Sequence, residues 1–256
     1  MEDKIKKAAK ILCRSKLNLA LTGAGISVES GIPDFRSKGG LWERYDIREY
    51  GTISAFESHP EKVWKMLAEM DAVVQQAEPN PAHKGLGRLQ DMGLLHTIIT
   101  QNIDNLHQEG GASRVIEYHG NSKTLSCLRC HRQYQREEVA DQIPPRCACG
   151  QILKPDVILF GESIHLKGLH ESYELASSCG AVLVIGTSAQ VAPANTIPVV
   201  AKRARASIIE INLEPTLLTA SLTDVFLQAK AGEVVPKLVR VVEGLREGSH
   251  MTRPLT

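Results

Sequence analysis

Four cysteines lie in two short pairs near the middle of the chain. Two residues separate Cys127 from Cys130, and after sixteen further residues one residue separates Cys147 from Cys149. Two closely spaced thiolate pairs can form a tetrahedron around Zn²⁺, and a four-cysteine site leaves no position for a catalytic water. Free thiols or a redox pair are the alternatives, but a redox C-x-x-C normally opens a helix of a thioredoxin-like unit. We therefore predict one structural zinc ion bound by these four cysteines.

A glycine turn follows the first predicted strand. The apolar residues 17–22 run into Gly23, Ala24 and Gly25. Glycines let the backbone approach a ligand closely, and amides at a helix start can hold a pyrophosphate. This indicates dinucleotide binding, but the third glycine of G-x-G-x-x-G would fall at Val28, and no acidic residue closes an obvious second strand about 20 residues later. On pattern alone, an ordinary turn remains the alternative.

A dense polar segment begins where another apolar strand, at residues 96–100, is predicted to end. It contains Gln101, Asn102 and Asp104. Ligands bind at the carboxyl ends of strands in open α/β sheets, and buried amides and carboxylates need partners. Asn and Asp are also common cap and turn residues, so the segment predicts either a ligand site or a loop.

One histidine follows a second strand-like run, at residues 115–118. This residue, His119, could act as a general base because the unperturbed pKa of histidine is about 6.5. Its position alone does not favour it over His83, His107 or His131.

The elements that must position these residues alternate between strands and helices. Such alternation predicts a Rossmann-like parallel sheet with helices on both faces. Residues 122–153 have too few apolar residues for a core of their own, so zinc would replace it. The predicted strands are residues 17–22, 96–100, 115–118, 157–160, 181–185 and 207–211, and the predicted helices are residues 3–14, 63–74, 168–178 and 194–205.

Length and charge limit the classes of protein. The 256 residues suit one large α/β domain with a smaller insertion, and the formal charge of +1 argues against a dedicated nucleic-acid binder. No apolar run approaches the roughly 18 residues that span a bilayer, and the charged start is unlike a signal peptide. We predict a cytoplasmic protein without membrane or direct nucleic-acid contacts. Residues 248–251 resemble a cloning remnant or a natural tail and are set apart from the fold.

Taken together, these motifs resemble the sirtuin family of NAD-dependent protein deacylases. They occur in the family's order over about residues 10–245. The resemblance is carried by residues 23–27, 30–36, 100–107 and 119–120, the four cysteines, and residues 154–157, 160–162, 186–188 and 211–212.

The resemblance implies a domain organisation that explains the irregular glycine motif, since a module interrupts the fold after the first crossover. A Rossmann-like NAD-binding domain would comprise residues 1–35, 76–121 and 154–247. A cofactor-binding loop with a helical module at 36–75 and a zinc-ribbon module at 122–153 would be inserted into it, and residues 248–256 would form a tail.

The resemblance also implies the site residues. Catalysis would depend on His119 as the general base and on Asn102. NAD would be contacted at its phosphates and neighbouring ribose by Gly23, Ala24, Gly25 and Arg36, and at its adenosine side by Gly186, Thr187, Ser188 and Asn212. Gln101 and Asn102 would position the nicotinamide ribose, Ile103 and Asp104 would line the nicotinamide pocket, and Phe35 would shield the reactive ribose carbon after nicotinamide leaves. The cofactor-binding set also includes Asp34, Leu213 and Glu214. An extended peptide would lie between residues 157–161 and 189–193, on Val157, Ile158, Leu159, Phe160, Gly161 and Val191.

The implied reaction transfers the acyl group of an acylated lysine in a protein or peptide to ADP-ribose, with release of nicotinamide. Family members that prefer succinyl or malonyl groups carry a Tyr and an Arg where this chain has Leu67 and Met70, so neutral acyl groups are expected here. Two alternatives are a protein mono-ADP-ribosyltransferase and a non-enzymatic acyl-lysine-binding module.

Overall fold

The structure is a computed structural model that describes residues 1–35 and 40–251, with side chains to residue 247. Arg36, predicted to contact the cofactor, lies outside the described residues. Within those ranges, no helix combines the length and apolar character that crossing a membrane requires.

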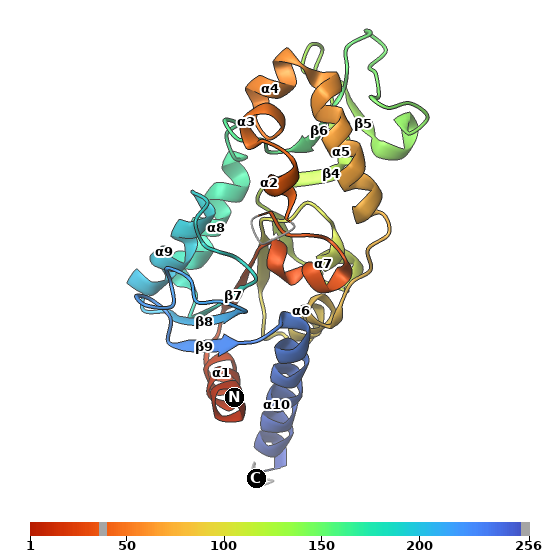
Figure 1. Cartoon of the computed structure of the whole chain (residues 1–256). Coiled ribbons are helices and arrows are strands. Elements are labelled where there is room, and N and C mark those ends of the chain that lie inside the picture. Colours follow the sequence, from red (N-terminus) through yellow and green to blue (C-terminus); the bar gives the residue numbers. More distant parts are fainter. Residues whose placement is uncertain (36–39, 252–256) are drawn as a thin grey trace.

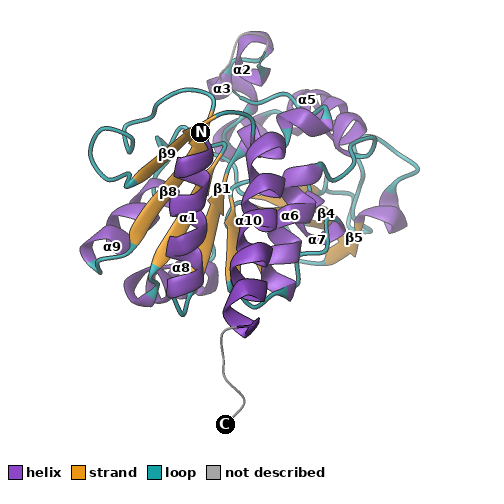
Figure 2. Cartoon of the chain, turned by 90° about the horizontal axis from the view of Figure 1, so that it is seen from below, coloured by secondary structure: helices purple, strands orange, loops and turns teal. Residues whose placement is uncertain are grey.

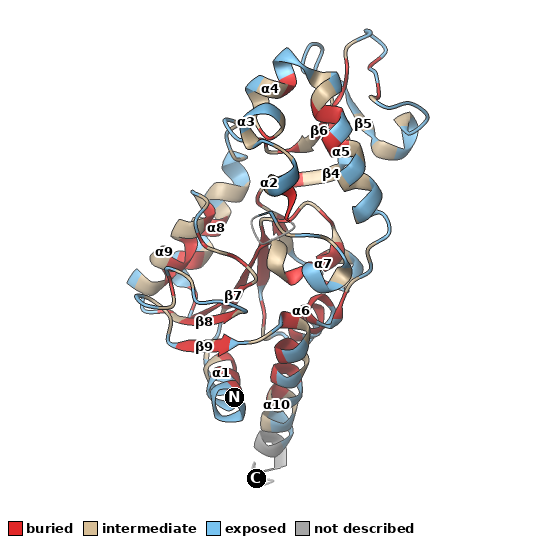
Figure 3. Ribbon diagram, in the orientation of Figure 1, coloured by how far each residue is buried: buried red, intermediate tan, exposed pale blue. Residues whose placement is uncertain are grey.

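The main sheet has six strands in the order β3-β2-β1-β7-β8-β9, and every neighbouring pair is parallel. This confirms the predicted Rossmann-like α/β class. The central strands are buried along their whole length because helices cover both faces (Figure 3). The strands are β1 (Asn18–Thr22), β2 (Thr97–Thr100), β3 (Val115–Glu117), β7 (Ala181–Ile185), β8 (Ser207–Asn212) and β9 (Val225–Gln228).

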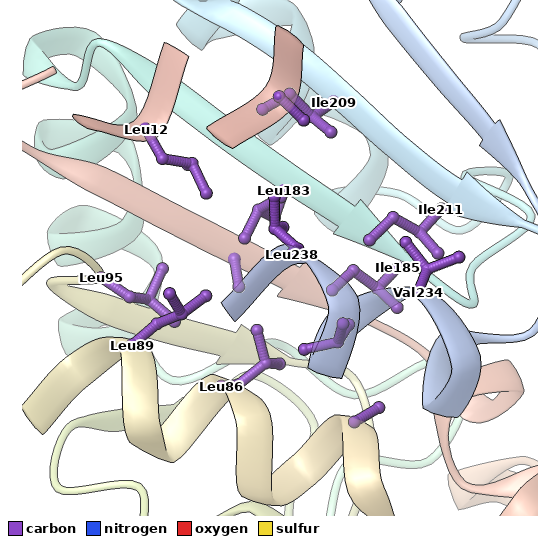
Figure 4. Packing of buried hydrophobic residues seen from close by; sticks show 14 of the residues in the cluster. Leu12, Leu86, Leu89, Leu95, Leu183, Ile185, Ile209, Ile211, Val234 and Leu238 are labelled. Carbon is purple, nitrogen blue, oxygen red and sulfur yellow. The ribbon is translucent and has the colours of Figure 1, made fainter. Parts of the chain in front are cut away.

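Helices cover both faces of this sheet, as Figure 2 shows. On one face lie α1 (Glu2–Arg14), α6 (Pro81–Asp91) and α10 (Ala231–Met251), and on the other lie α8 (Leu166–Ser178) and α9 (Ile197–Arg203). Leu12 of α1, Leu86 of α6 and Leu238 of α10 pack toward Leu183 of the sheet (Figure 4).

The helix α10 was not predicted from the sequence. It contains Val234, Val235, Leu238 and Val242, which are buried against the sheet. It also continues through residues 248–251, which we had set apart from the fold.

A smaller domain lies at one end of the molecule (Figure 1). Its core joins the helical module to the cysteine segment, because Phe56 and Trp64 pack with Leu125 and Leu153. The Trp64 indole also donates to the Leu153 carbonyl at 2.8 Å. Its elements are α2 (Leu41–Arg44), α3 (Ile47–Tyr50), α4 (Ile53–Ser58) and α5 (Pro60–Val74), with a sheet of β5 (Gln133–Gln135), β4 (Gly120–Ser126) and β6 (Lys154–Val157) in that order.

The strand expected at residues 157–160 differs in place and partner. The observed strand is β6, Lys154–Val157, and it pairs antiparallel with β4 instead of joining the parallel sheet. Its buried apolar residues face the small-domain core, which a pattern of hydrophobicity alone cannot distinguish from the main core.

The order of the strands places the site. Successive strands run outward in one direction from β1 to β3 and in the other from β7 to β9. The carboxyl ends of β1 and β7 therefore form the topological switch point at which open α/β sheets bind ligands.

Candidate active site

The glycine turn after β1 packs directly on the turn after β7. The Gly25 N–H donates to the Gly186 carbonyl at 2.8 Å, and a Cβ atom on Gly25 would lie 2.8 Å from the Gly186 Cα. Gly186 has a φ of +59°, and its own Cβ would lie 2.3 Å from the Ile26 nitrogen. Only glycines allow this contact, and it exposes backbone at the switch point, as a dinucleotide cradle requires.

The polar residues predicted to bind the cofactor come together at the same sheet edge. The Gln101 side chain donates to Thr187 Oγ1 at 3.0 Å, and the Asn212 side chain donates to the Thr187 carbonyl at 2.9 Å. These bonds join the carboxyl ends of β2, β7 and β8. Ser188 follows within the same turn, whereas Leu213 and Glu214 lie exposed after β8.

Asn102 is fixed by two hydrogen bonds. Its Nδ2 donates to the Gly23 carbonyl at 3.2 Å and to Ser27 Oγ at 3.0 Å. Ser27 Oγ in turn donates to Asp104 Oδ2 at 2.6 Å. Because both amide hydrogens of Asn102 are used, its Oδ1 is the side-chain atom left for a ligand.

His119 faces this cluster through its ring. Its Nδ1 lies 3.0 Å from the Gln101 carbonyl oxygen, which only accepts, so Nδ1 carries the proton and Nε2 has the lone pair. Burial lowers the pKa of His119 below its usual value, and the bond to Gln101 opposes that shift. The side chain is therefore neutral at pH 7, in the form that a general base needs.

The residue after His119 explains how the ring is held. Gly120 has a φ of +73°, and a Cβ there would lie 1.9 Å from the Asp156 carbonyl oxygen. Glycine thus lets β4 approach β6, and the Ile158 N–H donates to the His119 carbonyl at 2.8 Å.

The other three histidines that the sequence offered as a general base have different surroundings. His83 and His107 are buried with ring centroids 4.9 Å apart, and burial lowers their pKa values to about 4 and about 3. His131 is exposed in the cysteine segment. The structure therefore distinguishes His119, which the sequence alone could not.

Sequence analysis named His107 and included Thr100 in a motif, but it did not predict the chain of hydrogen bonds behind Asn102. His107 Nε2 lies 2.8 Å from Thr22 Oγ1, which donates to Thr100 Oγ1 at 2.9 Å, and Thr100 Oγ1 accepts the Asn102 N–H at 3.1 Å. The sequence signals were that Thr22 and Thr100 both end an apolar strand and that Thr100 and His107 lie in the motif at residues 100–107.

Three aromatic rings lie together where the chain enters the small domain. Phe35 stacks on Trp42 with centroids 5.5 Å apart, and Trp42 lies 6.4 Å from Phe160. Phe35 directly precedes the predicted cofactor loop, and the Asp34 carbonyl before it accepts the Leu41 N–H at 3.0 Å.

The predicted peptide segment after β6 connects His119 to the small domain. The Phe160 N–H donates to the Gly51 carbonyl at 2.9 Å, and the Phe160 carbonyl accepts the Ile53 N–H at 3.0 Å. Leu159 is buried and Gly161 is exposed. Val191, in the opposite predicted segment, is half-buried, and its carbonyl accepts the Asn195 N–H at 3.0 Å.

The four predicted metal ligands form one cluster. Their Sγ atoms all lie within 4.8 Å of one another, with Cys127 and Cys149 at 3.6 Å and Cys130 and Cys147 at 3.5 Å. Tetrahedral zinc with Zn–S bonds of about 2.3 Å requires sulfurs about 3.8 Å apart, so the cluster fits. The backbone N–H of Cys149 and the Tyr134 hydroxyl lower the pKa of Cys147 to about 6, which favours the thiolate. The geometry confirms the predicted structural zinc site.

The sequence and the fold match known proteins. The pattern of the Sir2 family matches residues 23–193. The chain is 46% identical over 252 residues to NAD-dependent protein deacylase 2 of Archaeoglobus fulgidus, covering 96% of this chain and 99% of that protein. It is 44% identical over 243 residues to NAD-dependent protein deacylase of Pyrococcus furiosus, covering 92% and 97%.

Solved structures agree with this match. A structure solved to establish the structural basis for the mechanism and regulation of Sir2 enzymes has a TM-score of 0.91 and 46% identity, covering 96% of this chain and all of that chain. A Sir2 homologue in complex with NAD has a TM-score of 0.87 and 42% identity, covering 93% and 94%. Sir2Af2 bound to a myristoylated histone peptide has a TM-score of 0.83 and 41% identity, covering 97% and 100%. The chain belongs to the Sir2 family, as its motifs predicted.

Proposed function

We propose that this chain is an NAD-dependent protein-lysine deacylase that transfers the acyl group to ADP-ribose. The observation that carries the proposal is the meeting of Asn102 and a neutral His119 beside the glycine cradle formed by Gly25 and Gly186. Relatives with this fold are named NAD-dependent protein deacylases, and a homologue was solved with NAD.

The placement of the residues supports the cofactor-binding roles that we propose for them. The turns at Gly23 and Gly186 offer backbone to the phosphates, and Thr187 and Asn212 lie where the adenosine half would extend over β8. NAD, when bound, supplies a ribose that is already joined to a cationic leaving group and that accepts the acyl group.

The chain's own groups then act on the acylated lysine. Asn102 presents Oδ1 to the ribose or to a water beside it, and Phe35 excludes solvent that would hydrolyse the cofactor. His119 accepts a proton at Nε2 from a ribose hydroxyl, which is the role its tautomer permits. Orienting these groups relative to the ribose and the acylated lysine supplies much of the rate enhancement.

The acyl group that the enzyme prefers is neutral. Leu67 and Met70 line a cavity with Ile103 and Val157, so neither position offers a cation to a succinyl or malonyl carboxylate. The test compares turnover of acetyl-lysine and succinyl-lysine peptides of one sequence. Efficient desuccinylation would refute this preference.

The activity itself is tested by incubating the protein with NAD and an acetylated peptide while following nicotinamide and deacylated peptide together. Equal yields are expected from the wild type, and His119→Ala should lose product formation but still bind NAD. Unchanged activity in His119→Ala would remove that residue from its role. ADP-ribose found on protein instead of O-acyl-ADP-ribose would favour mono-ADP-ribosyl transfer.

The partner in this proposal is an acylated-lysine protein or peptide. The solved Sir2Af2 complex with a myristoylated histone peptide supports this class of partner. A cytoplasmic location, without membrane or nucleic-acid binding, completes the proposal and agrees with six cysteines that form no disulfide.

A further inference from the structure

A small cavity lies beside the active site, between helix α5 and the sheet of the small domain. Its volume is about 30 Å³, enough for one or two waters. Leu67 and Met70 of α5 line the cavity, together with Ile103 and Val157. Only Asp71 and Arg136 among its lining residues are charged.

One end of the cavity adjoins the reacting groups. Ile103 directly follows Asn102, and Val157 pairs with Gly120, the residue after His119. Ser122 of β4, which also lines the cavity, donates to the Ile103 carbonyl at 3.3 Å. An acyl group whose carbonyl lies near His119 would therefore point its chain into this cavity.

An ion pair also lines the cavity. Arg136, in the short helical turn Arg136–Val139, donates to Asp71 Oδ2 on α5, and both side chains are largely buried, with 15% and 17% exposed. The guanidinium also lies over the Trp64 ring, 5.4 Å from its centroid. This contact holds the cysteine segment against α5.

The strand register limits the separation between Arg136 and His119. Gln135 pairs with Thr124, so the next residue, Arg136, lies abreast of Lys123. Lys123 comes four residues after His119 in the chain, so their backbones are separated by at most roughly 13 Å at about 3.3 Å per residue. The Arg136 side chain lines the cavity.

We infer that the Asp71–Arg136 ion pair is the distal wall of the acyl pocket and sets acyl selectivity by charge and by length; this inference rests on the deacylase function proposed above. Asp71 neutralises Arg136, so a terminal carboxylate finds no free cation and meets the Asp71 charge instead. The pair also joins α5 to the cysteine segment and thereby limits the length of chain that fits.

The charge effect is tested with Asp71→Asn, which keeps the shape but frees the guanidinium. Peptides of one sequence carry acetyl-, glutaryl- or adipoyl-lysine. The ratio of kcat/KM for the dicarboxylic acyl groups to that for acetyl should rise at least tenfold in Asp71→Asn. The gain should vanish in Asp71→Asn combined with Arg136→Met, because the cation is then gone.

The length effect is tested with Arg136→Ala, which removes the wall. This test remains valid even if Asp71→Asn fails to fold. The ratio of kcat/KM for octanoyl to that for acetyl should rise, by about fourfold for each methylene newly buried. The matched control is Glu69→Gln, on the same helix, which breaks the exposed ion pair to Arg44 and should leave every ratio unchanged.

Acetyl-peptide turnover separates the two ways of failing. A wild type that releases no nicotinamide with acetyl peptide would overturn the proposed function. A second outcome would overturn the role of the ion pair alone. In that outcome the wild type deacetylates, thermal melting shows that Asp71→Asn and Arg136→Ala are folded, and the kcat/KM ratios are unchanged. Equal changes in Glu69→Gln would also overturn it.

Discussion

At the scale of single residues, the site depends on side chains that orient others. Ser27 accepts from Asn102 and donates to Asp104, so its hydroxyl fixes the amide while satisfying a buried carboxylate. A hydrogen bond to a charged group contributes about 1.5–3 kcal/mol. We predict that Ser27→Ala lowers kcat/KM for an acetylated peptide by about ten- to a hundredfold, measured by nicotinamide release.

A matched control for that change is Ser178→Ala. Ser178 is exposed on α8 and donates only to carbonyls of its own helix, so its removal should leave the kinetics unaltered. If Ser27→Ala and Ser178→Ala have the same kcat/KM, Ser27 does not orient Asn102.

At the scale of elements, the approach of β4 to β6 places His119. Gly120→Ala would put a Cβ against the Asp156 carbonyl and force the strands apart. We predict a loss of kcat/KM greater than tenfold and of about 2 kcal/mol or more in the free energy of unfolding, measured by urea titration.

Gly93→Ala is the control, since its φ is also positive, at +68°, but no atom lies within 4 Å of the added Cβ. It should lose about 1–2 kcal/mol of stability without loss of activity; equal activity in the two variants would contradict the prediction.

The zinc site acts on the same elements. Removing the metal should loosen the cysteine segment, because the bonds from the four cysteines to zinc stand in for a hydrophobic core of that segment's own. We predict one zinc per chain by elemental analysis, and parallel loss of zinc and deacylation in Cys130→Ser. Cys13→Ser, on the exposed side of α1, should retain both. Full activity of metal-free protein would show that the small domain holds His119 without zinc.

At the scale of the whole molecule, patterns of residues predicted the parallel sheet and the zinc cluster because both depend on local signals. The apolar run at residues 181–185 became β7, and the cysteine spacing fitted one metal. The sequence did not predict that β6 leaves the main sheet, because its pairing with β4 is a long-range choice. Nor could it separate His119 from His83, since burial and hydrogen-bond partners arise only when distant strands meet.

The buried histidines link the stability of the whole fold to pH. Burial lowers the pKa of His83 to about 4 and that of His107 to about 3, so the unfolded chain, with histidine pKa values near 6.5, binds more protons between these limits. Stability from these groups is therefore complete above about pH 6.5 and is lost as pH falls toward 4. We predict a loss of about 2 kcal/mol per histidine between pH 7.5 and pH 5 in the free energy of unfolding by urea. Protonation of the zinc ligands also destabilises the fold as pH falls. The contribution of His107 is therefore measured as the difference in the pH dependence of the free energy of unfolding between the wild type and His107→Asn, in which this dependence should be weaker. The exposed His131→Asn should keep the full dependence, and a slope equally steep in His107→Asn would mean that His107 does not carry it.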